Sequence, residues 1–381
     1  MSKLKVLELF GGIGACSKAL ERLEIDYEIA DYVEIDKYAV KSFNAIHNTS
    51  FEPQDICTWN KDIEVDLIMH GSPCQDFSLA GRQAGGDEGS GTRSSLMYET
   101  IRIVEKLEPK YVIWENVKNV LSKKHKHNFE NYLSAMEHLG YTNYYQVLNA
   151  KDYGIPQNRE RVFVVSIKGR IINFHFPTKQ ELKLKLKDML EDEVDEKYYL
   201  SDKMMNYVLD NNNTQKGTKW EGRADNDTLN SNIAHTLSVR GAGGSQRAGV
   251  SNFIVDNVND EIKVKDLKLR IKEATKQGYK EAFEGDGVNI SSRMKYQRGN
   301  VQKESIQTIT TSGGNDRGVV INDLRIRKLT PKECWRLMGF DDEDYEKASK
   351  FNSNTQLYKQ AGNSIVVNVL EAILKELLIN E

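Results

Sequence analysis

The stretch LELFGGIGACSKAL, residues 7–20, decides the fold: it predicts a buried strand, a glycine turn and a helix. This arrangement lets the backbone approach a nucleotide-like ligand. Glu34 follows Gly14 by 20 residues, at the end of the next predicted strand, where a carboxylate can accept hydrogen bonds from ribose hydroxyls. Ser17 replaces the third glycine of the dinucleotide fingerprint, which favours an adenosine ligand without a pyrophosphate, such as S-adenosylmethionine. A nicotinamide cofactor fits these residues nearly as well.

The first 170 residues alternate short apolar runs with helical patterns. Such alternation is typical of an α/β fold with a largely parallel sheet and helices on both faces. Strands are predicted at 5–10, 28–34, 65–70, 110–115 and 161–167, and helices at 15–23, 36–46, 95–107 and 128–139.

The length of 381 residues allows two domains with sizeable cores. From about residue 171 the texture changes to acidic clusters and polar segments rich in glycine and asparagine. We therefore expect a catalytic and cofactor-binding domain at 1–175 and a smaller domain at 176–355. The C-terminal segment, 356–381, is expected to return to the first domain.

Composition excludes several classes of protein. Hydrophobic residues make up 39% of the chain and charged residues 29%, which suits a soluble globular protein. No apolar run approaches ~18 residues and the N-terminus lacks a secretory pattern, so we expect a cytoplasmic protein. The four cysteines lie far apart, which argues against a zinc site and a disulfide framework. The net charge of −3 gives no overall basic signal, so any nucleic-acid-binding surface must come from a local cluster of basic residues.

A candidate active site follows from three short motifs. Cys74, in GSPCQDFS, stands where a predicted strand ends, although a lone cysteine is usually a buried core residue. Glu115, in ENV, ends the neighbouring strand, and Arg159 and Arg161, in QNRER, precede another. Taken alone, Glu115 could be a helix cap or a salt-bridge partner, and the two arginines could be surface charges. Together they place a thiol, a carboxylate and cations at the carboxyl ends of adjacent strands, beside the predicted adenosine pocket.

The predicted smaller domain, 176–355, contains a faint internal repeat. Residues 234–250, AHTLSVRGAGGSQRAGV, resemble 306–320, IQTITTSGGNDRGVV. Two similar hairpins with flexible tips would explain the repeat, and so would two loops that approach a polyanion. Local positive charge slightly favours the second interpretation.

The order of the motifs FGGIG, GSPCQ, ENV, QNRER, RKLTPKECWRLMGF and QAGNSIV resembles the DNA cytosine-5 methyltransferase family, of bacterial or phage type. The resemblance covers the first domain and the last ~60 residues. It implies a Rossmann-like S-adenosylmethionine-dependent sheet with a smaller, mixed target-recognition domain. It also implies a monomer in a bacterial cell or phage-infected host that methylates C5 of a cytosine flipped from double-stranded DNA. No metal is suggested.

The resemblance implies roles for individual residues. Cys74 would attack C6 of cytosine, and Glu115 would hold N4 and protonate or hydrogen-bond N3. Arg161 would bind the O2 edge, and Arg159 would position the sugar-phosphate or the thiol. Cofactor-binding positions are Phe10, Gly12, Gly14, Glu34, Asp55, Ile56, Pro73, Leu96, Asn363 and Ile365. DNA-binding candidates are Gln75, Ser78, Arg93, Arg240, Arg247, Arg298, Thr308 and Arg317.

Three alternatives stay open at this point. An RNA cytosine-5 methyltransferase would share these motifs, although the variable region 176–320 favours sequence readout on duplex DNA. A nicotinamide oxidoreductase would leave Cys74, Glu115 and Arg161 without a role. An inactive DNA-binding relative would lack catalytic residues, all of which are present here.

Overall fold

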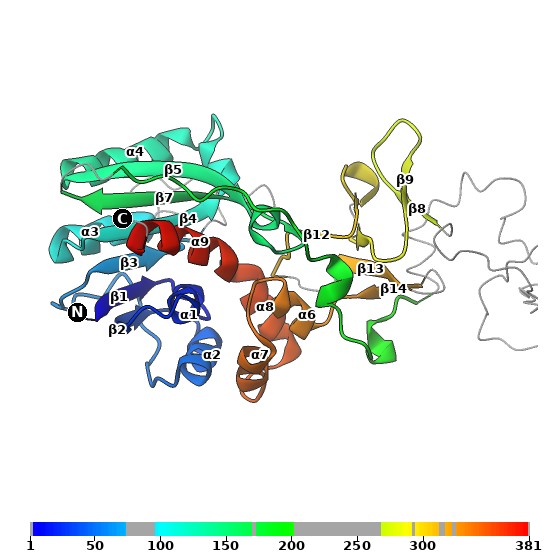
Figure 1. Cartoon of the computed structure of the whole chain (residues 1–381), viewed down its shortest axis with the longest axis horizontal. Helices are drawn as coiled ribbons and strands as arrows, with labels where there is room; N and C mark the ends of the chain where they lie inside the picture. The colour runs from blue at the N-terminus through cyan, green and yellow to red at the C-terminus, as the bar shows by residue number, and fades with distance from the viewer. Residues whose placement is uncertain are drawn as a thin grey trace, which may run out of the picture.

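The structure is a computed structural model of the chain (Figure 1). It describes residues 3–73, 96–169, 173–201, 268–291, 294–311, 317–321 and 325–379. The predicted site residues Cys74, Gln75, Ser78, Arg93, Arg240 and Arg247 lie outside the described residues.

A six-stranded sheet forms the larger part of the molecule, in the order β2-β1-β3-β4-β7-β5. Strands β2, β1, β3 and β4 pair in parallel, whereas β7 runs antiparallel to both of its neighbours, β4 and β5. The α/β class is confirmed. The bounds are β1 Leu4–Leu9, β2 Tyr27–Val33, β3 Leu67–His70, β4 Tyr111–Val117, β5 Tyr141–Asn149 and β7 Glu160–Lys168.

Strand β5 was missed by the sequence prediction. It is an edge strand, YTNYYQVLN, in which Tyr145 is half exposed, so neither a continuous apolar run nor a clean alternation marks it. Its pairing with β7 explains the antiparallel end of the sheet, because only the short turn η3 (Ala150–Tyr153) and β6 (Gln157–Asn158) separate the two strands.

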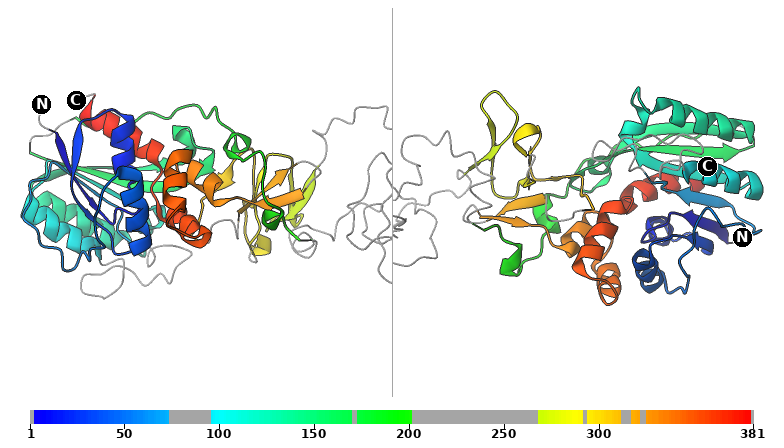
Figure 2. Two further views of the ribbon diagram at one scale, coloured as in Figure 1. Left: turned by 90° about the horizontal axis from the view of Figure 1, so that it is seen from below. Right: turned by 180° about the vertical axis from the view of Figure 1, so that it is seen from behind.

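Helices cover both faces of this sheet, as predicted (Figures 1 and 2). Helices α1 (Ala15–Arg22) and α9 (Val367–Leu378) share one hydrophobic core with Val6 and Ile113 of the sheet. Helices α3 (Met97–Leu107) and α4 (Lys126–His138) share another core with the alternate residues Val112 and Trp114. A parallel sheet needs such cover because its strands are apolar on both faces. Helix α2, Lys37–His47, follows β2.

A smaller part of the chain forms its own sheet, in the order β11-β10-β13-β14, with antiparallel pairing throughout. A separate hairpin, β8–β9, packs into the same hydrophobic core through Leu269, Ile271 and Ala282. The domain boundaries at 175 and 355 stay a prediction. The bounds are β8 Leu269–Lys272, β9 Tyr279–Ala282, β10 Gly287–Asn289, β11 Val301–Gln302, β13 Arg317–Ile321 and β14 Arg325–Lys328.

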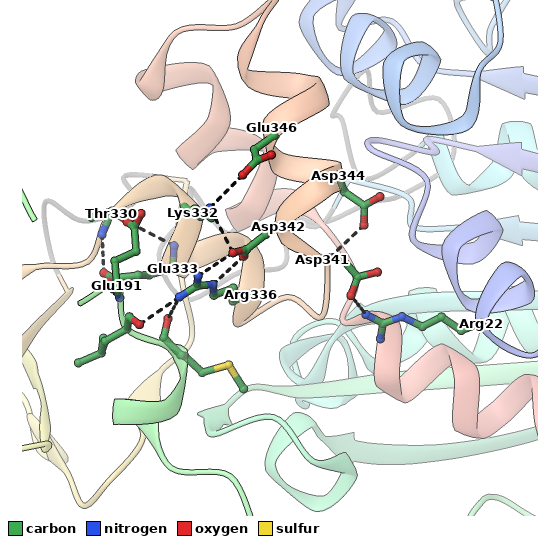
Figure 3. A network of polar contacts seen from close by, with 12 residues as sticks. Arg22, Glu191, Thr330, Lys332, Glu333, Arg336, Asp341, Asp342, Asp344 and Glu346 are labelled. Carbon is green, nitrogen blue, oxygen red and sulfur yellow. Dashed lines mark hydrogen bonds and ion pairs between the residues drawn. The ribbon is translucent and has the colours of Figure 1, made fainter. Parts of the chain in front are cut away.

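Three helices lie between the two sheets (Figure 1), and a polar network joins them to their neighbours (Figure 3). Arg336 donates to both carboxylate oxygens of Asp342, and to the carbonyls of Met189 and Leu190. Arg22, at the end of α1, pairs with Asp341 at 2.8 Å. The bounds are α6 Pro331–Arg336, α7 Asp342–Ser349 and α8 Asn354–Asn363.

A buried ion pair anchors α6. Arg327 and Glu333 form two hydrogen bonds, of 2.6 and 2.8 Å, and both side chains are almost fully buried. The Glu333 carboxylate also accepts the backbone N–H groups of Thr330, which caps α6, and Glu191. Four donors therefore converge on one buried carboxylate, which offsets its desolvation.

We expect Glu333→Ala to lower the free energy of unfolding by about 3–5 kcal/mol, because the Arg327 guanidinium would be left buried without its partner. Urea unfolding followed by circular dichroism measures this change. As a control, Lys347→Ala removes an exposed pair with Glu343 and should cost less than ~1 kcal/mol. Equal losses in the two variants would show that the buried pair does not stabilise α6 as argued.

Among the described residues, no helix combines the length and the apolar character that a membrane span requires.

Candidate active site

The glycine turn after β1 brings two predicted cofactor residues together. Phe10, Gly12 and Gly14 all have left-handed backbone conformations, with φ of 53°, 58° and 82°. A Cβ on Gly14 would lie 2.2 Å from Nε2 of His47, so only glycine fits there. The turn directs the Gly12 N–H toward the Glu34 carboxylate, whose Oε2 accepts it at 3.2 Å. The local geometry follows from the FGGIG sequence.

Glu34 lies directly after β2 and has two backbone donors. Its Oε1 accepts the N–H of Asp36 at 2.8 Å, in addition to the contact with Gly12. Burial raises the pKa of this carboxyl, while these N–H groups act in the opposite direction. Ile35, the next residue, is 68% exposed. A carboxylate fixed beside a glycine turn suits the ribose hydroxyls of an adenosine ligand.

Other predicted cofactor residues lie at the same edge of the sheet. The Gln54 N–H donates to the Glu34 carbonyl at 2.9 Å, which joins the turn holding Asp55 and Ile56 to the end of β2. Ile365 approaches the end of β3, since a Cβ on Gly71 would lie 3.5 Å from its Cδ1. Three further predicted cofactor positions are described residues: Pro73 after β3, Leu96 at the N-cap of α3, and the exposed Asn363 at the end of α8.

The predicted acid and one arginine meet on adjacent strands. Glu115, on β4, and Arg161, on β7, form an ion pair with 3.0 Å between Oε1 and Nε. Both side chains are largely buried. Burial raises the pKa of the Glu115 carboxyl, and the two nearby guanidinium groups, of Arg161 and Arg159, only partly oppose this. Burial therefore favours the protonated form of this carboxyl, which is the direction that a general acid needs.

Arg159 makes its described contacts inside the protein. Its guanidinium is buried and donates to three backbone carbonyls, those of Ile309 at 3.1 Å, Gly362 at 3.1 Å and Ser364 at 2.7 Å. A Cβ on Gly362 would lie 2.4 Å from the carbonyl carbon of Thr310, so the two backbones are in close contact. Both terminal nitrogens are thus engaged within the protein. Arg159 thus joins the segment at Ile309 to the segment 362–364, and its role toward the sugar-phosphate or the thiol stays a prediction.

The segment 306–311 is fixed against the QNRER motif. Strand β12 (Ile306–Gln307) pairs in parallel with β6, and the Thr308 hydroxyl donates to the Asn158 carbonyl at 3.0 Å. The Ile309 N–H donates to the Gln157 side chain at 3.1 Å. In the described structure β12 pairs with β6, and β13 pairs with β10 and β14, so the hairpin interpretation of 306–320 is wrong. Thr308 lies beside the strand that leads to Arg159 and Arg161.

The two described arginines proposed for DNA contact lie in different environments. Arg317 is only 8% exposed, and its Nε donates to the Thr308 carbonyl at 3.0 Å. This contact makes it a support for the segment at Thr308, and its contact with DNA stays a prediction. Arg298 is exposed, and its Nε donates to the Ala274 carbonyl at 3.1 Å. Its outer nitrogens are the better placed to reach a phosphate or a base.

Sequence reasoning missed three residues that contact one another just before the described chain reaches Pro73. Ser72 is buried just before Pro73, and accepts hydrogen bonds from the side chains of Trp114 and Asn116. Trp114 belongs to an apolar run and Ser72 to a loop-like stretch, so no sequence pattern singles out either residue. Only the position of Asn116 inside ENV gave a signal.

Comparisons with known proteins identify a family and several relatives. The model of the family "C-5 cytosine-specific DNA methylase" matches residues 4–378. A type II methyltransferase of Lactococcus lactis subsp. cremoris, M2.ScrFI, is 33% identical, with 98% of this chain and 99% of the relative covered. The orphan methyltransferase M.SPRI of Bacillus phage SPR is 32% identical, with 99% and 98% covered. The crystal structure of the S. pombe Dnmt2 methyltransferase has a similar fold, with a TM-score of 0.61, 19% identity and coverage of 99% and 98%.

Proposed function

The chain belongs to the C-5 cytosine-specific DNA methylase family, and from this premise we propose that it methylates C5 of a flipped cytosine through a covalent intermediate on Cys74. It is an enzyme that methylates cytosine in DNA. The proposal concerns how it does so and which residues take part. The observation that carries it is the buried pair of Glu115 and Arg161 at the edge of the sheet where β3 delivers Gly71, Ser72 and Pro73.

The chemistry needs a nucleophile, because C5 of cytosine is too poor a nucleophile to accept a methyl group directly. Addition of the Cys74 thiolate to C6 breaks the 5,6 double bond and moves its electron pair toward C5 and N3. S-adenosylmethionine, when bound, supplies an electrophilic methyl group for C5. Loss of the C5 proton to a base then returns the electron pair to the ring, and the bond from Sγ to C6 breaks. Cys74 is thereby regenerated.

Glu115 would stabilise the charge that moves into the ring. Its raised pKa favours the protonated carboxyl, which can donate to N3 while the other oxygen accepts from the N4 amino group. A cation beside this carboxyl suits the O2 edge of the same base, and Arg161 is held there by its contact with Glu115. The two side chains would thus read one edge of a cytosine. Such contacts require the base to leave the duplex stack.

The cofactor proposal rests on the glycine turn and Glu34. The carboxylate would accept the ribose hydroxyls, and the open space beside Gly12 in the left-handed turn would leave room for the ligand against the backbone. Asp55, Ile56, Pro73, Leu96, Phe10, Asn363 and Ile365 complete the proposed pocket.

We place the substrate as double-stranded DNA and the active species as a monomer. Transfer of tritium from labelled S-adenosylmethionine tests the substrate directly, with duplex DNA, single-stranded DNA and transfer RNA as acceptors. We expect label on duplex DNA, recovered as 5-methyl-2′-deoxycytidine after digestion. Label on transfer RNA alone would instead support the RNA branch of the family.

Recognition of DNA is proposed for the smaller sheet and its loops. Arg298→Ala should weaken binding to all duplexes and reduce the slope of log Kd against log salt by about one unit if it contacts phosphate. If it reads a guanine edge, it should cost ~1–3 kcal/mol on the cognate site alone. Titrations at several salt concentrations separate these outcomes. Lys375→Ala, at an exposed position of α9, is the control, and identical behaviour of the two variants would place Arg298 outside the interface.

A further inference from the structure

Ser72 is held by two residues of the neighbouring strand. Its hydroxyl oxygen accepts the indole N–H of Trp114 at 3.0 Å, and its carbonyl accepts the side-chain amide of Asn116 at 3.3 Å. Ser72 is only 3% exposed and stands two residues before Cys74. Strands β3 and β4 pair in parallel with His70 opposite Trp114, so Ser72 falls beside Asn116 where the backbone ladder has ended. Side-chain hydrogen bonds thus continue the pairing beyond the last strand residue.

Trp114 is itself fixed in one orientation. It is fully buried, and its ring packs against Tyr132 at 4.3 Å and lies nearly parallel to His70, at 5.9 Å and 3°. His70 shares a hydrogen bond of 3.0 Å with the Tyr132 hydroxyl. Burial lowers the pKa of His70 to about 3, which keeps the ring neutral and compatible with this apolar packing. The indole N–H therefore points at Ser72 with little freedom.

Asn116 is fixed in the same way. Its side-chain oxygen accepts the N–H of Val117 at 2.8 Å, which leaves the amide group directed at Ser72. The side chain is 1% exposed. Trp114 and Asn116 lie on one face of β4, and Glu115 lies on the opposite face because side chains alternate along a strand. A single strand thus carries the acid on one face and the contacts to Ser72 on the other.

Gly71, the residue before Ser72, lies near the Glu115 carboxylate. A Cβ on this residue would lie 3.7 Å from Oε2 of Glu115, so the segment leading to Cys74 passes close to the acid. Any displacement of Ser72 along β4 would change the separation between the thiol and the carboxyl. Displacements of about 1 Å in a reacting group can cost on the order of 10²-fold in rate.

We propose that Trp114 and Asn116 are positioning residues for the nucleophile: by holding Ser72 against β4, they set the place of Cys74 relative to Glu115. This inference rests on the proposed function of Cys74. The two residues touch neither substrate nor cofactor, and they act through Ser72.

The test compares Trp114→Phe, Ser72→Ala and the double variant. Trp114→Phe removes the N–H and keeps an aromatic ring, whereas Ser72→Ala removes one oxygen. We expect each single variant to form the covalent complex with a 5-fluorocytosine duplex about 10- to 100-fold more slowly than the unmodified enzyme. The KM for DNA and the affinity for S-adenosylmethionine should stay unchanged. The double variant should be no slower than the slower single variant, because both changes remove the same hydrogen bond.

Trp335→Phe is the matched control. Trp335 lies in α6, and its buried indole N–H donates to the carbonyl of Leu357 in α8 at 3.0 Å. It should lose similar thermal stability and trap DNA at the normal rate. If Trp114→Phe does not fold, Ser72→Ala carries the test alone.

Normal trapping rates in both folded single variants would overturn the inference, and so would equal slowing in Trp335→Phe. Failure of the unmodified enzyme to trap or methylate DNA would instead overturn the proposed function. The two failures are therefore distinguishable.

Discussion

Cys74→Ser should lose methyl transfer by ~10⁴-fold or more, while binding of DNA and S-adenosylmethionine persists. A serine hydroxyl stays protonated near neutral pH, whereas a thiol with a pKa of ~8.5 is readily converted to a thiolate by nearby cations. The substitution is nearly isosteric, so the fold should be retained. Single-turnover transfer of a tritiated methyl group measures the rate, and equilibrium titrations measure the two affinities.

The exposed cysteine Cys57 provides the control. Cys57→Ser makes the same chemical change and should leave the rate within about two-fold, since its thiol has no step to perform. A Cys74→Ser enzyme that retained a tenth of the normal rate would exclude the covalent route.

Glu115→Gln should lower turnover by about 10²- to 10⁴-fold without changing stability by more than a small amount. The amide still fits beside Arg161, but it cannot give a proton to N3. Single-turnover rates and thermal melts measure the two effects. Glu99→Gln is the control, because this carboxylate pairs with Arg102 at the surface of α3. Activity within a few-fold of normal would make Glu115 a structural residue.

The pH dependence gives a second readout of the same group. Burial raises the pKa of Glu115, and the active form in the proposal is the protonated carboxyl. The rate should therefore fall as pH increases through this raised pKa, and that fall should be absent from Glu115→Gln. For folding, the same sign applies: the folded state favours the proton, so this contribution to stability is present below the ordinary carboxyl pKa and is lost as pH rises through the folded value.

Much of the catalytic sheet could be predicted because its signals are local. The apolar runs at 65–70 and 110–115 became β3 and β4, and the FGGIG turn placed Gly12 against Glu34. A buried parallel strand is continuously apolar, and a left-handed turn needs glycine, so both can be recognised within a few residues. The edge strand β5 has neither signal, since one of its faces meets solvent.

The roles of the arginines could not be predicted in the same way. Arg159 and Arg161 stand two residues apart in QNRER, yet one donates to carbonyls from residues 309, 362 and 364 and the other pairs with Glu115. Those partners are distant in sequence, and no periodicity connects them. Arg317 is a similar case, because its burial follows from the pairing of β13 with two other strands. Charge alone suggested a nucleic-acid contact, which stays a prediction, and only tertiary packing shows that Arg317 also supports Thr308.

The most direct test of the central claim is covalent capture on a long duplex in which 5-fluorocytosine replaces cytosine. After attack at C6 and methyl transfer, fluorine cannot leave C5 as a proton does, so the enzyme stays attached to the base. We predict a complex that survives denaturation and requires S-adenosylmethionine, with the cross-link mapped by peptide mass spectrometry to Cys74. A cross-link at any other residue, or no complex on a duplex that the enzyme methylates when it carries ordinary cytosine, would contradict the account.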